Sequence, residues 1–452
     1  MNSTNNFSEN SGKGQVYDSG DIAWTLSCTT LVWLMVPGIG FFYSGLARSR
    51  SALSLIILCC WSIAVVSIQW FLFGYSLALS DGSKCPFIGG VDRVLLYGLD
   101  GPNYDDGGGN RVVPEVLFCI YHSMVAGITP ALVVGAVAER GRFLPTLTAQ
   151  VVFMFIWSTL VYDLVAYWTW GQAGWANKLG ALDFAGGTPV HVASGAAAIA
   201  YAMQLGEREG RHVLNYKPHN LVQVVLGTSL MWFGWFGFNS GNAMGANARA
   251  AMVLLVTNLS ASFGGITWAL VDYRKNKSFS ALSFCFGAVA GLVSVTPASG
   301  FIRPASAPVF GIIGAIACRW ASGLKHAIRL DDALDVVTVH GVGGLIGTLL
   351  TGIFAERGMA AWDGITCIEG GWIDGNWMQV PVQIGHCVAG GVWSFIVTYA
   401  ILWIMNKIPG LKLRVDTASA KFGLDKGEIG ECAYERVPPV PPGGEGSGSD
   451  PS

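Results

Sequence analysis

Two stretches of this sequence share one pattern: DFAGGTPVHVASG at residues 183–195 and DALDVVTVHGVGG at residues 332–344. In each, an acidic residue stands eight positions before a histidine, and small residues follow the histidine directly. The stretches open the fifth and the tenth of eleven apolar segments. An offset of five turns the two halves upside down relative to one another, as in transporters built from inverted repeats. We therefore expect an all-α polytopic membrane protein with eleven transmembrane helices, arranged as a five-plus-five inverted repeat plus a final helix.

The eleven segments are long enough to span a bilayer, because about 17–25 residues of helix cross a hydrocarbon layer of roughly 30 Å. A weaker similarity between residues 40–45 of the first segment and 237–241 of the sixth follows the same offset. The expected spans lie near residues 22–47, 52–79, 115–137, 145–169, 189–205, 221–241, 248–271, 279–297, 306–322, 336–355 and 379–406.

The composition also indicates a membrane protein. Charged residues make up 12% of the 452 residues, about half of their usual share in soluble proteins, and apolar residues make up 52%. The 60 glycines fit close packing between membrane helices. The formal net charge of −2 gives no indication of nucleic-acid binding.

The ten cysteines form no CxxC or Cys/His spacing of the kind that binds metal, so we expect no metal site and no cofactor. Most of them lie inside apolar segments, as small core residues do. Cys85 and Cys367 both fall in expected outer loops, and a disulfide between them stays open.

Lysine and arginine predict the orientation, since loops on the cytoplasmic side are enriched in them. With the N-terminus outside, seven such residues are spread over longer outer loops, and the shorter inner connections hold the larger number. We therefore expect a plasma-membrane protein with its N-terminus outside and its C-terminus in the cytoplasm. The inner residues are Arg48, Arg50, Arg140, Arg142, Arg208, Arg211, Lys217, Arg274, Lys275, Lys277, Lys325 and Arg329.

Two polar tails flank the membrane domain. Residues 1–21 form the expected extracellular tail, in which Asn2 and Asn6 match the glycosylation pattern, a short motif that also occurs by chance. Residues 22–406 form the transmembrane domain, and residues 407–452 form a cytoplasmic tail. The Pro/Gly/Ser-rich end predicts disorder after about residue 437.

His191 and His340 are the candidate functional residues. Symmetry-related positions of an inverted repeat approach each other near the middle of the membrane, and small residues such as Gly195 and Gly344 allow close helix contact. An ionisable side chain at that depth is a functional candidate. The alternative is two unrelated core histidines. We expect packing or hydrogen-bonding roles for His122 and for His386.

Several motifs resemble those of the ammonium transporter family (Amt/Mep/Rh). They are the run from Asp183 to His191, continued through Gly195 to Arg208, and PGIGFFYSG at 37–45, GWFGFN at 234–239, VTPA at 295–298 and DDALDVVTVHG at 331–341. The match runs in order from about residue 20 to 435. YWTWG at 167–171 and the histidine at position 191 look most like the fungal Mep branch that keeps both pore histidines.

The resemblance implies a homotrimer with one pore in each subunit, and ammonium or methylammonium as substrate. Trp170 would recruit the cation at an outer site, together with Asn242 and with Tyr43 near the same vestibule. Asp183 would organise that site without touching the substrate.

Phenylalanines close the pore above the histidines in the family pattern. Phe238 and the neighbouring Trp235 match this pattern. The second phenylalanine position aligns with Val125, so we expect a more open constriction unless another aromatic side chain fills the space.

The tail segment FGLDKGEIGECAY at 422–434 resembles the inner regulatory motif of the family, with Asp425, Glu431 and Tyr434 as candidate docking residues. The family often has histidine where Ile429 stands. A cytosolic regulator or kinase acting on this tail is the implied partner, and an inert tail is the alternative.

These features favour an ammonium transporter that deprotonates the cation and conducts ammonia past two histidines, with or without a separate proton. A nutrient sensor on the same fold and a passive gas channel of Rh type are the alternatives. No nucleophile–base pair or metal-ligand cluster indicates an enzyme.

Overall fold

The computed structural model describes residues 17–80, 82–99, 113–142, 147–208, 217–327 and 329–434. Within these residues the fold is helical and contains no strand. The glycosylation candidates Asn2 and Asn6, and the tail after residue 437, lie outside the described residues.

Eleven helical segments coincide with the eleven expected spans. Nine of those that the structure describes are long and apolar enough to cross a membrane, α11 is a shorter apolar helix, and the eleventh is formed by η5 and α8. The segments are α1 (Ser19–Leu46); α2 (Ala52–Gln69), η2 (Trp70–Gly74) and α3 (Tyr75–Leu79); α4 (Glu115–Val137); α5 (Leu147–Trp157), η4 (Ser158–Tyr162) and α6 (Asp163–Trp170); η5 (Gly187–Val192) and α8 (Ala193–Leu205); α9 (Leu221–Ser240); α10 (Ala248–Asn276); α11 (Ala281–Val295); α12 (Ala307–Ala327); η8 (Val337–Val342) and α13 (Gly343–Phe354); and α15 (Gln379–Lys407).

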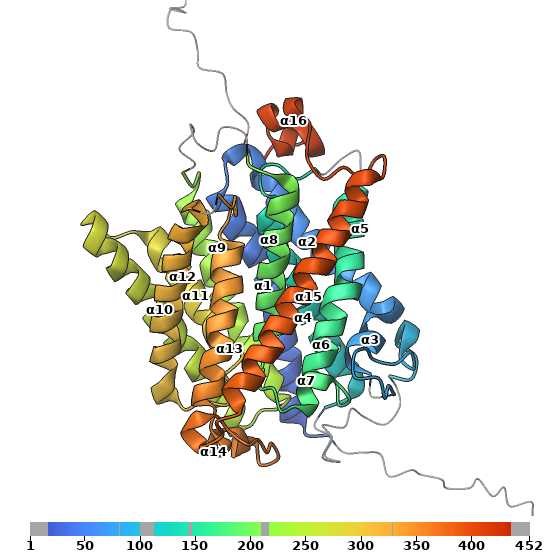
Figure 1. The fold of residues 1–452 in the computed structure, drawn as a ribbon, viewed down its shortest axis with the longest axis vertical. Coiled ribbons are helices and arrows are strands. Elements are labelled where there is room, and N and C mark those ends of the chain that lie inside the picture. Colours follow the sequence, from blue (N-terminus) through green and yellow to red (C-terminus); the bar gives the residue numbers. More distant parts are fainter. Residues whose placement is uncertain are drawn as a thin grey trace, which may run out of the picture.

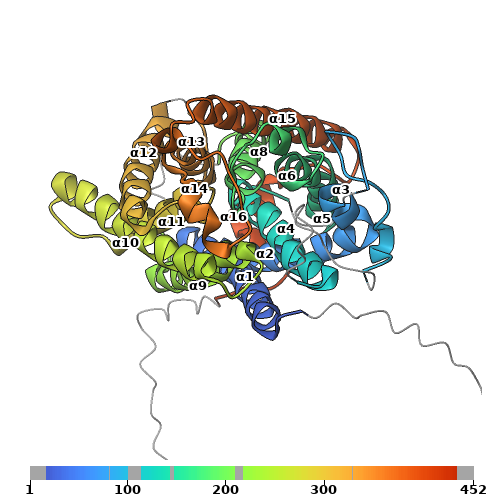
Figure 2. The same ribbon diagram turned by 90° about the horizontal axis from the view of Figure 1, so that it is seen from below.

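The two halves of the chain form two groups of helices. Seen along the bundle, α2 to α8 lie on one side and α9 to α13 on the other, while α15 runs across both groups (Figure 2). α15 packs on α8 and α5 of the first group and on α13 of the second. The final helix of the predicted arrangement therefore contacts both halves of the bundle.

The two described ends of the chain lie on opposite faces of the bundle. The short helix α14 (Arg357–Ala360) is at one end and α16 (Thr417–Phe422), in the tail, is at the other (Figure 1). Asp21, near the start of α1, accepts a hydrogen bond from the backbone of Ala246, whereas Ala47, just after α1, accepts one from the backbone of His219. An odd number of crossings requires this separation.

Cys85 and Cys367, between which the sequence left a disulfide open, are both exposed and are free cysteines in the structure.

Both histidine segments begin with a π-helical turn, η5 in the first half and η8 in the second. Such wide turns are rare and often occur at functional sites. The same uncommon turn at equivalent places of the two halves extends the repeat from the sequence to the backbone.

Candidate functional site

The structure brings His191 and His340 together in the interior of the bundle. Their Nδ1 atoms are 3.3 Å apart, and the rings are stacked with centroids separated by 5.3 Å. Only 1% of His191 and 5% of His340 is exposed. The Nε2 atom of His191 is buried and has no hydrogen-bond partner among the described residues. The pair therefore has unused hydrogen-bonding capacity inside an apolar region.

The acid eight residues before each histidine fixes the turn that carries it. The Asp183 carboxylate accepts hydrogen bonds from the backbone N–H groups of Gly186, Gly187 and Thr188, at 2.7–2.8 Å. Asp332 accepts from Val336 and Val337 in the same way, at 3.0 and 2.8 Å. The first N–H groups of a helix have no partner within it, and a carboxylate satisfies several of them at once. The repeated acid–histidine spacing is thus a positioning device.

Glycines let the two histidine segments cross at short range. A side chain on Gly195 would overlap the backbone of Gly341, and one on Gly344 would press on the carbonyl oxygen of Gly187 and on His191. The hydroxyl of Ser194, the residue before Gly195, donates to the carbonyl oxygen of Val190 at 2.6 Å and lies 3.1 Å from that of Thr129.

A cavity of about 280 Å³, here called the Trp170 cavity, lies at the end of the bundle where α1 begins. The Trp170 indole N–H donates to the carbonyl oxygen of Asp183, which links the tryptophan to the residue that caps η5. The residues that line the Trp170 cavity are Val113, Phe118, His122, Trp170, Asn177, Phe184, Asn242, Ala243, Met244, Arg249, Asp363, Ile365 and Thr366.

The charges in this cavity are paired with each other. Arg249 donates to Asp363 at 2.7 Å, and its guanidinium lies over the rings of Phe184 and Phe301. Burial alone would raise the pKa of the Asp363 carboxyl, but hydrogen bonds from Thr366 and the charge of Arg249 hold that pKa below its usual range. The pair therefore leaves little net charge to repel a cation.

Phe238 and Trp235 form a tight region next to the histidines. The Trp235 ring stacks on His191 at 5.4 Å, and Phe238 lies 6.3 Å from the same imidazole. Val125 is 1% exposed and is not among the residues that line the Trp170 cavity.

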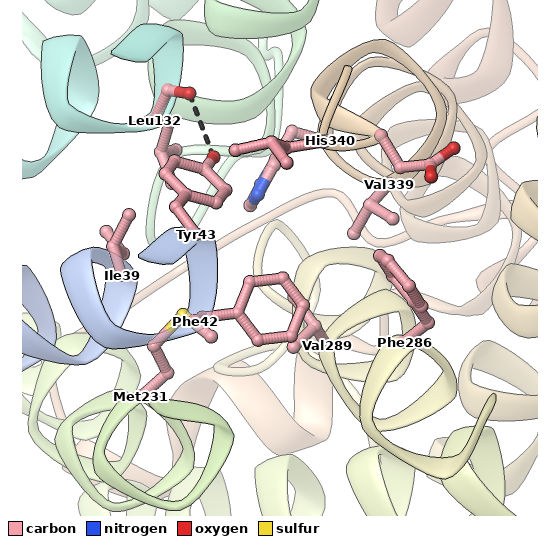
Figure 3. Close-up of a pocket in the computed structure, with 11 residues that line it drawn as sticks. Ile39, Phe42, Tyr43, Leu132, Met231, Phe286, Val289, Val339 and His340 are labelled. Atoms are coloured by element: carbon pink, nitrogen blue, oxygen red, sulfur yellow. Dashed lines mark hydrogen bonds between the residues drawn. The ribbon is translucent and has the colours of Figure 1, made fainter. Parts of the chain in front are cut away.

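A second cavity, here called the Tyr43 cavity, lies toward the opposite end of α1 and is lined in part by His340 (Figure 3). Its volume of about 10 Å³ holds roughly one water molecule. The ring of His340 points into a space bordered by Phe42, Tyr43 and Phe286. The Tyr43 hydroxyl donates to the carbonyl oxygen of Leu132 at 2.9 Å.

Tyr43 corrects our expectation, which put it near the same vestibule as Trp170. The residue stands three positions before the end of α1, and it contacts the opposite cavity. Asn242 does line the Trp170 cavity, and its side-chain amide donates to the carbonyl oxygen of Phe238.

The tail is docked on the face opposite the Trp170 cavity. Asp425 accepts hydrogen bonds from the backbone N–H groups of Leu53 and Ser54, and from the Ser54 hydroxyl. The Tyr434 hydroxyl lies within hydrogen-bonding distance of Gln223, at 2.8 Å, and of His219, at 3.3 Å. Glu431 is exposed and makes no hydrogen bond or ion pair in the part of the chain that the structure describes.

His122 is the residue that sequence reasoning missed. We expected it to pack or to form hydrogen bonds in the core, but it lines the Trp170 cavity, with its ring centroid 5.8 Å from that of Trp170. The helical spacing of Phe118, His122 and Val125 was an available signal, because residues four and three apart share one face of a helix. His386, by contrast, contacts the hydroxyls of Thr169 and Thr188, as a hydrogen-bonded core histidine does.

Comparisons with known proteins agree on one family. The model of the Ammonium Transporter Family matches residues 23–434. The chain is 49% identical to Ammonium transporter 1 of Schizosaccharomyces pombe, over 93% of this chain and 83% of that protein, and 41% identical to Ammonium transporter MEP2 of Saccharomyces cerevisiae, over 93% and 84%.

Solved structures give the same result. The crystal structure of Candida albicans Mep2 matches with a TM-score of 0.81 and 41% identity, covering 89% of this chain and 88% of that one. Saccharomyces cerevisiae Mep2 matches with a TM-score of 0.83 at 41% identity, covering 90% and 92%. A structure described as a sensor Amt protein matches with a TM-score of 0.80 at 27% identity, covering 90% and 98%.

Proposed function

Because this chain belongs to the ammonium transporter family, and is therefore a multi-pass membrane transporter of ammonium and not an enzyme, we propose the route by which the substrate crosses. Ammonium is recruited in the Trp170 cavity and gives up a proton there, which is either released to the water on that side or passed on through the histidine pair. Ammonia then passes along the His191–His340 pair into the Tyr43 cavity. Methylammonium follows the same route.

The observation that carries this proposal is the buried imidazole pair between two cavities. Transfer of a bare cation into such apolar surroundings costs far more than transfer of a neutral amine. Ammonium can lose a proton and become neutral, whereas K⁺, an ion of similar size, cannot. A path that accepts only the neutral species therefore rejects alkali cations.

The contact between the two Nδ1 atoms supports a role in conduction. A hydrogen bond between them needs one protonated and one unprotonated nitrogen, so in two neutral rings one Nε2 is an acceptor and the other a donor. Ammonia both donates and accepts hydrogen bonds, and it can bind at either end of the pair. The same pair can pass a proton, and whether that proton accompanies ammonia decides between net ammonium and ammonia transport.

Recruitment by Trp170 follows from the electrostatics of an indole ring. The face of the ring attracts a small cation with roughly 0.5–2 kcal/mol. Asn242 adds a polar group in the same cavity, and the Arg249–Asp363 pair leaves little opposing charge.

The test is uptake of radiolabelled methylammonium by cells that lack their own ammonium transporters. We expect His191→Ala and His340→Ala each to reduce uptake sharply while the protein still reaches the membrane. The matched control is His386→Gln, a change at another buried histidine outside the proposed route. Uptake by the double variant that equals wild type and stays selective against K⁺ would remove the histidines from the mechanism.

We also propose that the N-terminus lies outside the plasma membrane, which makes the Trp170 cavity the outer one. The arginines and lysines expected in the inner connections and the start of α1 at this cavity support this orientation. An epitope tag before Asn2 should bind antibody on intact cells, and a tag after Ser452 should bind only after permeabilisation. The reverse result would invert the proposed direction of transport.

The same family membership supports a homotrimer with one pore in each chain. Apolar side chains such as Trp33, Phe263 and Ile396 are exposed on the helices of the single chain, where they can face neighbouring subunits or lipid. Native mass spectrometry in mild detergent should give three times the mass of one chain. A monomer that transports ammonium would overturn the trimer and leave the route intact.

The docked tail favours a second role, regulation of the pore by a cytosolic partner such as a kinase, or a sensor function on the same fold. Asp425 contacts the start of α2, and Tyr434 contacts the start of α9. Truncation after Met405 should change transport and signalling together if the tail transmits a signal. Loss of transport with intact signalling would argue against that role.

A further inference from the structure

We propose that His122 is a substrate-binding residue of the Trp170 cavity, and that its imidazole makes recruitment selective for ammonium over alkali cations. This inference rests on the proposed transport of ammonium through that cavity. It adds a hydrogen-bond acceptor to a site whose other wall, the face of Trp170, attracts every small cation.

His122 borders the cavity from α4, and its side chain has no competing partner. The residue is 4% exposed, and its Nδ1 atom is buried without a hydrogen bond in the described part of the chain. A buried ring nitrogen without a partner carries an energetic penalty, and native structures seldom leave one unless a ligand or water occupies the place. Because His122 also lines the Trp170 cavity, we place the hydrogen bond from a bound cation on this ring.

The neighbouring rings hold the imidazole beside the tryptophan. Phe118, one turn earlier on α4, contacts the His122 ring at a centroid distance of 4.3 Å, and Tyr121 meets it edge-on at 5.3 Å. Trp170 lies on the cavity side at 5.8 Å. A cation held against Trp170 is therefore within reach of His122.

The charged groups of the cavity are already engaged. Arg249 is the cation on α10, and Asp363, in the loop before α15, accepts from both Arg249 and Thr366. Arg249 repels a cation, and the Asp363 carboxylate is already occupied by Arg249 and Thr366. The unengaged acceptor of this cavity with the highest basicity is the His122 imidazole.

An imidazole separates ammonium from K⁺ for a chemical reason. Ammonium brings four N–H donors, and a neutral imidazole offers one lone pair in a defined direction. Hard alkali and alkaline-earth cations are bound by oxygen ligands, and a single nitrogen is a poor replacement. A site built to accept a hydrogen bond disfavours an analogue that cannot donate one. Trp170 thus supplies attraction and His122 supplies discrimination.

The missing ring at position 125 fits this assignment. Val125 follows His122 by three residues on α4 and is not among the residues that line this cavity. The aromatic wall that α4 presents to the cavity consists of Phe118 and His122, and one of these two rings bears an acceptor.

Three substitutions separate hydrogen bonding from ring packing. His122→Phe keeps a flat ring against Phe118 but removes the acceptor. His122→Leu removes both, and its apolar side chain preserves burial. His122→Gln keeps a hydrogen-bond acceptor without a ring. The measured quantities are the half-saturating concentration for methylammonium uptake, the maximal rate, and inhibition of uptake by K⁺.

We expect His122→Phe and His122→Leu to raise the half-saturating concentration about tenfold or more, the usual effect of losing a hydrogen bond to a charged group. In both variants, inhibition of uptake by K⁺ should increase in proportion to the rise in the half-saturating concentration. His122→Gln should stay closer to wild type in both quantities. The maximal rate should change little, because His191 and His340 are untouched.

Wild-type affinity and K⁺ resistance in His122→Phe would overturn the inference. So would an equal loss in His122→Phe and His122→Gln, since packing alone would then explain the effect. Failure of the proposed function has a different signature: the wild-type protein would take up no methylammonium, or the His191→Ala/His340→Ala double variant would do so normally.

Discussion

Gly195 and Gly341 meet backbone to backbone where the two histidine segments cross. A Cβ atom on Gly195 would lie 2.5 Å from the backbone nitrogen of Gly341 and closer still to its Cα. Gly341 follows His340 directly, and Gly195 stands one helical turn after His191. The contact between these glycines therefore sets the distance between the two imidazoles, which is 3.3 Å at Nδ1.

Gly195→Ala should separate the histidines and reduce methylammonium uptake about a hundredfold, the size of effect that a displacement of 1 Å can have at a reacting site. The overpacked contact should also cost about 1–3 kcal/mol of stability. Gly341→Ala should be milder, because its Cβ would lie 3.3 Å from Gly195. Gly385→Ala, in α15, is the matched control, since nothing lies within 4 Å of its Cβ. Wild-type uptake by Gly195→Ala would contradict this account.

Asp183→Asn should lower the thermal midpoint in detergent and reduce uptake, although the side chains have the same shape. Both carboxylate oxygens accept backbone N–H groups, and the amide would turn one acceptor into a donor that faces a backbone N–H of η5. Leaving a buried donor unpaired costs about 1–3 kcal/mol. Asp332→Asn should behave alike in η8. An unchanged midpoint in both variants would mean that the acids do not hold the histidine turns.

Asp425→Ala should release the tail from the start of α2. It removes a buried acceptor used by the backbone of Leu53 and by Ser54, and trypsin should then cleave after Lys426 about tenfold faster, as expected from the loss of hydrogen bonds to a charged group. Glu431→Ala is the control in the same segment, because that exposed side chain has no such contact. Equal cleavage of the two variants would show that Asp425 does not dock the tail.

The sequence predicted the fold well because the membrane imposes simple rules. Each span needs an apolar stretch of sufficient length, and all eleven were found as helices. The repeated spacing of acid and histidine could be recognised in the sequence because it has a structural role. Asp183 and Asp332 cap the turn at a fixed number of residues before each histidine. The π-helical form of those turns could not be predicted from the sequence, since no local pattern encodes it.

Side-chain placement around the pore was harder to predict than the spans. Tyr43 stands about 36 Å along α1 from Ser19, at 1.5 Å per residue, so it cannot share a vestibule with Trp170 at the other end. The direction in which the first span crosses the membrane would have been enough to predict that Tyr43 and Trp170 lie at opposite ends. The helical spacing of Phe118 and His122 places them on one face of α4, but the direction in which that face points needed tertiary information, because it depends on how α4 packs on α1, α2 and α8.

Asp331 should make the face of the bundle that binds the tail sensitive to acid. Its carboxylate pairs with the buried guanidinium of Arg140 at 3.0 Å and with Arg208 at 2.9 Å. Burial alone would raise the pKa of Asp331, but the hydrogen bonds and charges of these arginines hold that pKa below its usual value. A carboxyl whose pKa is depressed by folding contributes stability above the pKa of the unfolded chain, and this contribution is lost as the pH falls through the folded pKa.

Asp331→Asn should therefore cost about 3 kcal/mol at pH 7, where it leaves Arg140 without its charged partner. Below pH 4 the wild-type protein should lose the same stabilisation, so the difference between the two thermal midpoints should shrink. A difference that is independent of pH would mean that Asp331 acts through packing and not through its charge.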